Sequence, residues 1–192
     1  MRVFLDACVL FPTVLREVLI GLAPLYRPLW SGRVLEEWRR AASDRLGADA
    51  GAIAAAEIAV LRDLFGDASD TDAAEPDGPA RARLAALETM ALPDEGDRHV
   101  IASAIAGGAD IIVTENRRDF PARVMRQLDL RVISPDEFIA ELARRDQPAV
   151  IKAARETLQR ARDLGGDVQP RALFKRARLP RLARLIAAQG GD

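Results

Sequence analysis

The chain has 192 residues, of which 49% are hydrophobic and 30% are charged, and its formal net charge is −1. This size and composition predict one globular domain with a modest extension and exclude wholesale disorder. A single cysteine, Cys8, excludes an internal disulfide, and one cysteine with one histidine, His99, cannot supply the usual ligands of a zinc site. The sequence has no apolar run long enough to cross a bilayer, and Asp6 comes too early for a secretory signal, so we expect a cytoplasmic protein with no membrane partner.

Short apolar runs alternate with segments of helical periodicity over most of the chain. We expect strands at residues 3–5, 26–30, 111–113 and 130–133. Helices are expected over residues 12–22, 31–46, 52–65, 80–90 and 98–106, and from Ser134 onward. This alternation favours an α/β sandwich with a central, mostly parallel sheet.

The stretch from Gly66 to Pro79 has a different composition. It is rich in acidic residues without a basic partner, set among glycine, proline and serine. The acidic positions are Asp67, Asp70, Asp72, Glu75 and Asp77. Because no apolar residues anchor these carboxylates on one rigid face, we expect a solvated loop rather than a metal site.

The end of the chain is helical and basic. Two helical segments are expected over residues 149–164 and 171–188, the second with a break near Pro180. Residues 1–143 hold 16 basic and 24 acidic side chains, whereas residues 144–192 hold 12 basic and 5 acidic ones. We therefore expect a domain over 1–143 that gathers cations and a C-terminal helical extension over 144–192 that meets a polyanion or an acidic partner. A solvated arginine-rich helix pair is the alternative for the extension.

Several polar residues follow the expected buried strands. Asp6 ends the first strand, and Thr114, Asn116 and Asp119 come soon after the strand at 111–113. Ligands of open α/β sheets bind beyond the carboxyl ends of the strands, so these residues are candidates for a site. Ordinary turn residues are the alternative.

Helical wheels single out two further carboxylates. Glu37 lies on the flank of the apolar stripe of its helix, whereas Glu36 faces away from it. Asp97 is centred on the buried face at the start of the helix over 98–106, where an ordinary helix cap is the alternative. His99 falls on the opposite side of that helix, so we expect it to point outward.

The candidate site is thus a group of carboxylates from distant parts of the chain, namely Asp6, Glu37, Asp97 and Asp119. Such a group is costly without a counter-charge, because like charges repel one another and raise their pKa values. Mg²⁺ or Mn²⁺ prefers oxygen ligands of this kind, and such ions promote phosphodiester hydrolysis. The sequence offers no credible serine or cysteine triad and no glycine-rich phosphate loop.

Four segments in this order resemble the PIN domain family, and more narrowly its VapC-like toxin ribonucleases. They are residues 3–10, 31–38, 97–104 and 112–120, within a resemblance that covers roughly residues 1–140. The resemblance implies an endoribonuclease that depends on Mg²⁺ or Mn²⁺ and leaves 5′-phosphate products. The implied catalytic residues and metal ligands are Asp6, Glu37, Asp97 and Asp119, with Thr114 and Asn116 assisting near the cation and Asp94 as a further acidic residue.

The resemblance also implies partners, and it has two departures. A cognate antitoxin normally holds such toxins inactive, and a homodimer is compatible with the family although the sequence gives no oligomeric state. Ala7 and Cys8 stand where the family has threonine or serine followed by asparagine, so we expect the side-chain hydrogen bonds of that position to be missing. The helical tail beyond about residue 145 exceeds the minimal domain of the family, and it resembles the C-terminal extension of a larger subgroup of VapC-like proteins.

We expect RNA to contact a basic run in the tail that contains no acidic residue. The run consists of Arg171, Lys175, Arg176, Arg178, Arg181 and Arg184. Two other functions remain open at this point. One is a non-catalytic PIN-like module that binds RNA or protein, and the other is a metal-dependent nuclease or phosphatase that acts on another phosphate ester.

Overall fold

A computed structural model of the chain describes residues 1–66, 69–72, 74–165 and 168–189. The chain forms two compact units. The first consists of Met1–Phe11 and Arg27–Ile133, and the second of Pro12–Tyr26 and Ser134–Asp192. The second unit therefore joins a segment from near the N-terminus to the C-terminal helices. The expected domain boundary between residues 143 and 144 stays a prediction.

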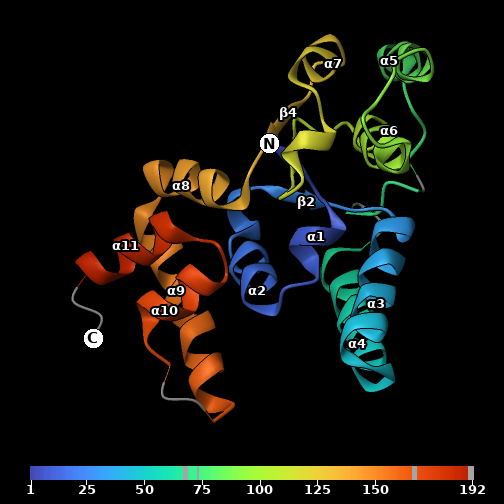
Figure 1. Ribbon diagram of the computed structural model, residues 1–192. Helices are drawn as coiled ribbons and strands as arrows, with labels where there is room; N and C mark the ends of the chain where they lie inside the picture. The colour runs from blue at the N-terminus through green and yellow to red at the C-terminus, as the bar shows by residue number, and fades with distance from the viewer. Residues whose placement is uncertain (67–68, 73, 166–167, 190–192) are drawn as a thin grey trace. The chain divides into compact units, whose positions relative to one another are not determined.

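The first unit is built on a parallel four-stranded sheet in the order β2-β1-β3-β4 (Figure 1). The strands are β1 (Arg2–Leu5), β2 (Arg27–Leu29), β3 (Ile111–Val113) and β4 (Arg131–Ile133). Every pair of neighbours is parallel. The two central strands are the most apolar, and all three residues of β3 are buried, as expected for a strand covered on both faces. The predicted α/β class with a parallel sheet and C-terminal helices is confirmed.

The helices of the first unit follow the apolar periodicity closely, and α3 and α4 lie side by side (Figure 1). They are α1 (Ala7–Leu10), α3 (Gly32–Leu46), α4 (Ala48–Phe65), α5 (Gly78–Glu88), α6 (Arg98–Ala106) and α7 (Ala122–Gln127). Two 3₁₀ turns, η3 (Glu95–Asp97) and η4 (Arg117–Asp119), complete it. The helix α4 begins before the expected residue 52. The short helices α1 and α7 were not predicted, because four and six residues are too few to show a period.

The acidic stretch after α4 takes part in the fold. Asp72 accepts a hydrogen bond from the backbone N–H of Gly32 at 2.7 Å, and Asp77 accepts one from Ala80 at 2.8 Å. Two carboxylates of the expected solvated loop therefore stabilise the N-termini of α3 and α5. The expectation of a purely solvated loop is wrong for these two residues, and Asp67 lies outside the described residues.

The second unit is helical. It contains α2 (Thr13–Gly21), η1 (Ala23–Leu25), α8 (Pro135–Arg145), α9 (Gln147–Asp163), α10 (Pro170–Arg176) and α11 (Pro180–Ala188). Ser134 and Glu137 form a reciprocal capping box at the start of α8, as their spacing predicts. The ring of Phe138 on α8 packs edge-on against Tyr26, with 5.0 Å between the ring centres. Within the described residues, every helix is too short or too polar to traverse a bilayer.

A buried carboxylate links α8 and α11 within the second unit. Asp136 accepts a hydrogen bond from the backbone N–H of Arg181 at 2.9 Å and another from its guanidinium at 3.0 Å. The side chain of Asp136 is only 10% exposed, whereas that of Arg181 is 47% exposed. Arg181, a member of the expected RNA-binding run, therefore also holds the first turn of α11.

We expect Asp136→Ala to lower the free energy of unfolding by about 1–3 kcal/mol, because it removes both hydrogen bonds of a mostly buried acceptor. Asp136→Asn should lose less, since its amide oxygen still accepts from the backbone N–H of Arg181. Urea denaturation followed by circular dichroism measures both variants. Two variants as stable as the wild type would show that this link does not stabilise the unit.

Candidate functional site

Asp6 and Thr114 meet at the carboxyl ends of β1 and β3. These strands are neighbours, and Leu5 pairs with Val113, so the residues that follow them come together. The Thr114 hydroxyl donates a hydrogen bond to Asp6 Oδ2 at 2.6 Å. Both residues are buried, with Asp6 5% and Thr114 0% exposed. The parallel register of the sheet therefore fixes this carboxylate.

Cys8 adds a second donor to the same oxygen. Its Sγ lies 3.1 Å from Asp6 Oδ2 and accepts a hydrogen bond from the backbone N–H of Glu115 at 3.3 Å. Burial, with a smaller contribution from the Asp6 charge, raises the pKa of Cys8 to about 12, so the group is a neutral thiol that donates to the carboxylate. The expectation that hydrogen bonds are missing at this position is wrong, because the short helix α1 turns Cys8 back toward Asp6.

Asp97 is the carboxylate whose proton binding is most affected by its surroundings. It lies in η3, directly before α6. Burial raises its pKa to about 6, followed by the charges of Asp6, Asp119, Asp94 and Glu37. Because charges act on one another most strongly at short range, the four contributing carboxylates lie in the neighbourhood of Asp97. The structure thus brings carboxylates from the end of β1, from α3, from η3 and from η4 into one region of the first unit.

Hydrogen bonds hold the turn that presents Asp97. Asp94 Oδ1 accepts a hydrogen bond from the backbone N–H of Gly96 at 2.7 Å. Arg98 donates to the carbonyl oxygen of Met90 at 2.8 Å and to that of Leu87, and it forms an ion pair with Glu95. Arg98 therefore ties the end of α5 to the start of α6. The sequence pattern gave no signal for this role.

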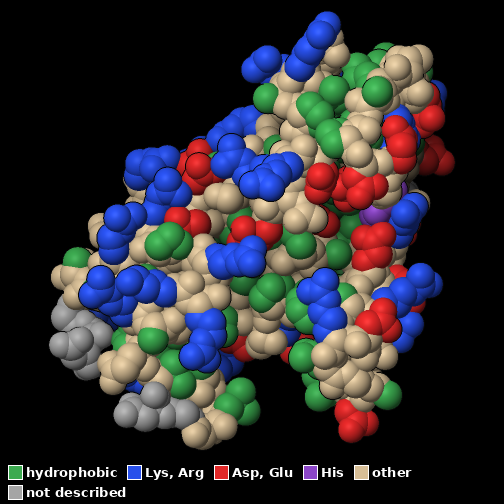
Figure 2. All heavy atoms as spheres, in the orientation of Figure 1, with side chains coloured by type: hydrophobic (Ala, Val, Ile, Leu, Met, Phe, Trp, Pro, Cys, Tyr) green, Lys and Arg blue, Asp and Glu red, His purple; other side chains and the backbone are tan. Residues whose placement is uncertain are grey.

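Glu37 pairs with His99 across two helices. His99 Nε2 lies 3.0 Å from Glu37 Oε1, and Arg33 Nε donates to the same oxygen at 3.2 Å. The His99 side chain is only 14% exposed, so the expectation that it points outward is wrong. His99 contacts Glu37 on α3, and the periodicity of α6 alone does not reveal a contact with another helix. Figure 2 shows acidic side chains gathered around this single histidine.

The protonation state of His99 follows from its surroundings. Burial lowers its pKa, although the Glu37 charge acts in the opposite direction. Its Nδ1 is buried and has no hydrogen-bond partner among the described residues. A proton on Nδ1 would be a buried donor without an acceptor, so we infer a neutral ring that donates from Nε2 to Glu37.

Of the other predicted residues, Asn116 and Asp119 follow Thr114 closely in the chain, and the basic run lies in the second unit. The backbone N–H of Asn116 donates to Thr114 Oγ1 at 3.0 Å, and that of Asp119 donates to the Asn116 carbonyl oxygen at 3.0 Å. Asp119 is half-buried and the Asn116 side chain is exposed. The six basic residues of the expected RNA-binding run lie in the second unit. The functional roles of all these residues stay predictions.

The donor chemistry of the carboxylate group fits a hard divalent cation. Carboxylate oxygens are the ligands that Mg²⁺ and Mn²⁺ prefer, and a cation would relieve the repulsion that adds to burial in raising the pKa of Asp97. Asp6 accepts its side-chain hydrogen bonds on Oδ2, which leaves Oδ1 for a ligand. As they stand, however, no three His, Cys, Asp or Glu side chains of the described part of the chain form a set that could hold a metal ion. Binding would therefore require side-chain rotations.

The raised pKa of Asp97 makes a prediction about stability. The folded protein binds this proton more tightly than the unfolded chain does, so wild-type stability should fall as the pH rises from about 4 to about 7. In the presence of EDTA, Asp97→Asn should raise the free energy of unfolding at pH 7 by about 1 kcal/mol, after allowance for solvent screening. Urea denaturation at both pH values measures this difference. At about pH 4, Asp97 is protonated in the folded protein and about half protonated in the unfolded chain, so most of the penalty is absent there. A gain of the same size at that pH would therefore indicate a packing effect instead.

Comparisons with known proteins agree with this architecture. A family model described as PIN domain matches residues 2–118, which include Asp6, Glu37 and Asp97 and end one residue before Asp119. A protein of Mycobacterium tuberculosis (strain ATCC 25618 / H37Rv) named "Putative ribonuclease VapC50" is 36% identical over 45 residues, which is 23% of this chain and 27% of that protein. The aligned stretch therefore spans about a quarter of either chain. No solved structure matches the chain. Since the family match covers more than half of the residues and the chain has the expected parallel sheet, the chain belongs to the PIN domain family.

Proposed function

We propose that this protein is an endoribonuclease that hydrolyses RNA phosphodiester bonds with the help of Mg²⁺ or Mn²⁺. The observation that carries the proposal is the site of Asp97, where burial and then the charges of Asp6, Asp119, Asp94 and Glu37 raise its pKa to about 6. A strongly perturbed carboxyl beside several others, at the carboxyl ends of parallel strands, is typical of a catalytic centre. The PIN family membership and the similarity to a protein named as a ribonuclease support the same class of reaction.

Asp6, Glu37, Asp97 and Asp119 would hold the cation in this proposal. When bound, it would supply positive charge that neutralises the scissile phosphate and lowers the pKa of an attacking water. Because the carboxylates repel one another without a counter-charge, we expect their side chains to turn toward the ion when it binds. Asp6 needs the least adjustment, because Thr114 and Cys8 already hold it through Oδ2.

The chain's own residues have positioning roles in the proposed reaction. Thr114 holds Asp6, and the backbone N–H of Asn116 in turn fixes the Thr114 hydroxyl. Asp94 adds negative charge near Asp97 and shapes the turn before α6. In the hydrolysis itself, the water oxygen forms a bond to phosphorus while the bond from phosphorus to the 3′ oxygen breaks. The 3′ oxygen takes up a proton, and a 5′-phosphate remains on the other product.

The VapC-like resemblance suggests a biological setting for this activity. In that setting the protein is the cytoplasmic toxin of a type II toxin–antitoxin pair, and a cognate antitoxin occupies the site until it is removed. The resemblance also suggests a homodimer. The basic run of the second unit would contact the RNA backbone through Arg171, Lys175, Arg176, Arg178 and Arg184, with a smaller part for Arg181, whose guanidinium is bound to Asp136.

One observation favours a different function. In the described part of the chain the carboxylates do not form a ready ligand set for a metal ion. A non-catalytic PIN-like module that binds RNA or protein would need no such set. The cleavage experiment below separates the two functions, and parallel assays on single-stranded DNA and a small phosphate ester test whether the enzyme acts on another phosphate ester.

We expect purified protein to cleave a labelled single-stranded RNA in the presence of Mn²⁺ or Mg²⁺ and to stop when EDTA is added. Asp6→Asn and Asp97→Asn should each lower the cleavage rate about 100-fold or more, because each removes a charged ligand. Glu36→Gln is the matched control: Glu36 lies on the same helix as Glu37 but is bound to Arg39 and Arg40. Cleavage that survives in Asp97→Asn, or a wild type that does not respond to either metal, would contradict the proposal.

His99 provides a test of how Glu37 is positioned. We expect His99→Leu to raise the Mn²⁺ concentration for half-maximal cleavage about 10-fold, because Glu37 loses the donor that orients it. His99→Gln should recover part of this loss, since its amide N–H can reach the same carboxylate. Thermal unfolding with and without Mn²⁺ gives a second readout that does not depend on turnover. An unchanged metal requirement in His99→Leu would show that this contact does not position a ligand.

A further inference from the structure

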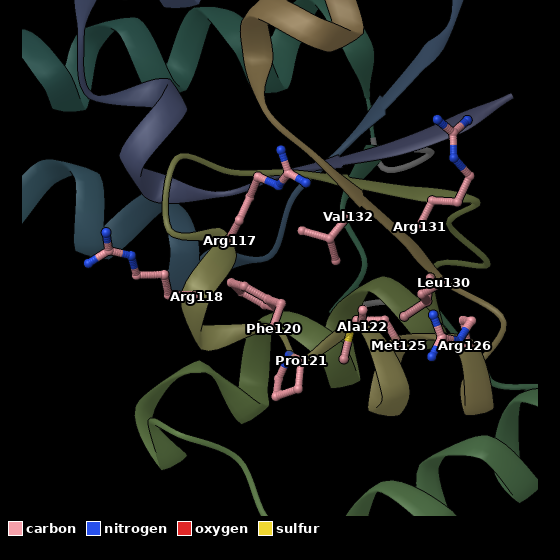
Figure 3. Close-up of a pocket in the computed structure, with 10 residues that line it drawn as sticks. All are labelled: Arg117, Arg118, Phe120, Pro121, Ala122, Met125, Arg126, Leu130, Arg131 and Val132. Atoms are coloured by element: carbon pink, nitrogen blue, oxygen red, sulfur yellow. The ribbon is translucent and has the colours of Figure 1, made fainter.

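The first unit contains an open groove beside the carboxylates, formed by η4, α7 and β4 (Figure 3). Its volume is about 590 Å³. Four of the lining residues are arginines, six are uncharged, and none is acidic. The arginines are Arg117, Arg118, Arg126 and Arg131, and the apolar residues are Phe120, Pro121, Ala122, Met125, Leu130 and Val132.

The arginines flank an apolar floor. Figure 3 shows Arg117 and Arg118 toward one end and Arg126 and Arg131 toward the other, with the apolar side chains between them. Phe120 and the other large floor residues are mostly buried, so they form a firm surface. In contrast, all four arginines are exposed. Among the residues that the structure describes, Arg118 and Arg126 have no ion-pair partner.

One end of the groove lies beside Asp119, one of the proposed cation ligands. Arg117 and Arg118, which line the groove, directly precede Asp119 in η4, and Phe120, which also lines it, directly follows. A group of carboxylates repels phosphates at a distance, so an anionic substrate needs positive charge immediately beside it. The groove supplies this charge within the first unit, which otherwise carries an excess of acidic residues.

We propose that this groove binds the backbone of single-stranded RNA next to the phosphate that is cleaved, and this inference rests on the proposed function. Arginine side chains bind phosphate oxygens through paired hydrogen bonds, and they keep their charge at any physiological pH. Pro121, Ala122 and Val132, which are at least partly exposed, offer apolar surface to ribose and base between the arginines. A positively charged groove that follows the backbone is a means by which proteins bind single strands without reading sequence. The groove would therefore hold the strand in register with the carboxylates.

An acidic segment of a protein partner is the competing occupant. The arginines alone would suit either ligand, but the position of the groove favours RNA. It begins at the residues proposed to act on a phosphodiester, so a strand whose scissile phosphate lies there must continue past η4. A protein partner would not require the charged groove and the carboxylates to be continuous.

The experiment measures RNA binding without cleavage. Every variant is made in an Asp97→Asn background, and a fluorescently labelled single-stranded oligouridine is titrated by anisotropy in EDTA at several salt concentrations. The test pair is Arg118→Ala with Arg126→Ala. The control pair, Arg81→Ala with Arg123→Ala, removes the same charge from exposed positions outside the groove, and Arg123 lies on α7 as Arg126 does.

We expect the test pair to weaken binding about 10-fold and to reduce the slope of log affinity against log salt by about 1.4, or roughly 0.7 for each lost phosphate contact. The control pair should change affinity less than 2-fold. Replacing the two groove arginines with lysine should restore part of the affinity, because the charge returns without the paired geometry. Thermal unfolding of each variant shows whether it is folded.

Two results would overturn the inference: an unchanged RNA affinity in the test pair, and an equal loss of RNA affinity in the test and control pairs. If the unchanged RNA affinity is accompanied by weaker binding of a labelled polyglutamate peptide, the groove belongs to a protein partner instead. Cleavage assays on groove variants that keep Asp97 separate this inference from the proposed function. Cleavage that is intact in the groove variants refutes the groove alone, whereas groove-dependent RNA binding by a protein that never cleaves refutes the hydrolysis alone.

Discussion

The crowding of negative charge at the carboxyl ends of β1 and β3 is the constraint on which this protein depends. A parallel sheet places Asp6 beside Thr114, and the 3₁₀ turns η3 and η4 bring Asp97 and Asp119 into the same region. This arrangement costs folding free energy at neutral pH, because burial and the neighbouring negative charges make ionisation of Asp97 harder. Such a cost is common where a fold maintains a site for function rather than for stability. Contacts elsewhere in the first unit hold these carboxylates, or the turns that present them, in position.

Neutral or positively charged donors hold Asp6 and Glu37 and the turn that presents Asp97. Thr114 and Cys8 hold Asp6, Arg98 anchors the turn before α6, and His99 contacts Glu37. Two of these contacts, Thr114 with Asp6 and His99 with Glu37, join residues far apart in the sequence. The groove beside η4 carries the opposite charge to the carboxylates, so strongly negative and strongly positive surfaces adjoin one another. This pairing of charges suits a substrate that is a polyanion and is attacked at a phosphate.

The local structure could be predicted from the sequence wherever a single element determines it. The apolar run at β3, the Ser31 cap and the capping box at Ser134 each depend on neighbours within four residues, and each is found where expected. The helical wheel of α3 also predicted that Glu37 lies on the flank of the buried face of this helix. In contrast, the positions of His99 and Cys8 depend on other elements packed against them, which a helical wheel does not contain. The groove escaped prediction for the same reason, because η4, α7 and β4 line it only when folded together.

The chain path has a consequence for how the protein is made. It leaves the first unit after Phe11 and returns at Arg27, so α2 belongs with helices that the ribosome synthesises more than a hundred residues later. The apolar face of α2, which includes Leu15, Val18 and Leu19, must await α9 before it is covered. During translation this amphipathic segment is a ready target for a chaperone. A shortened gene product that ended after β4 would carry the same uncovered face permanently, and we expect it to aggregate even with its sheet intact.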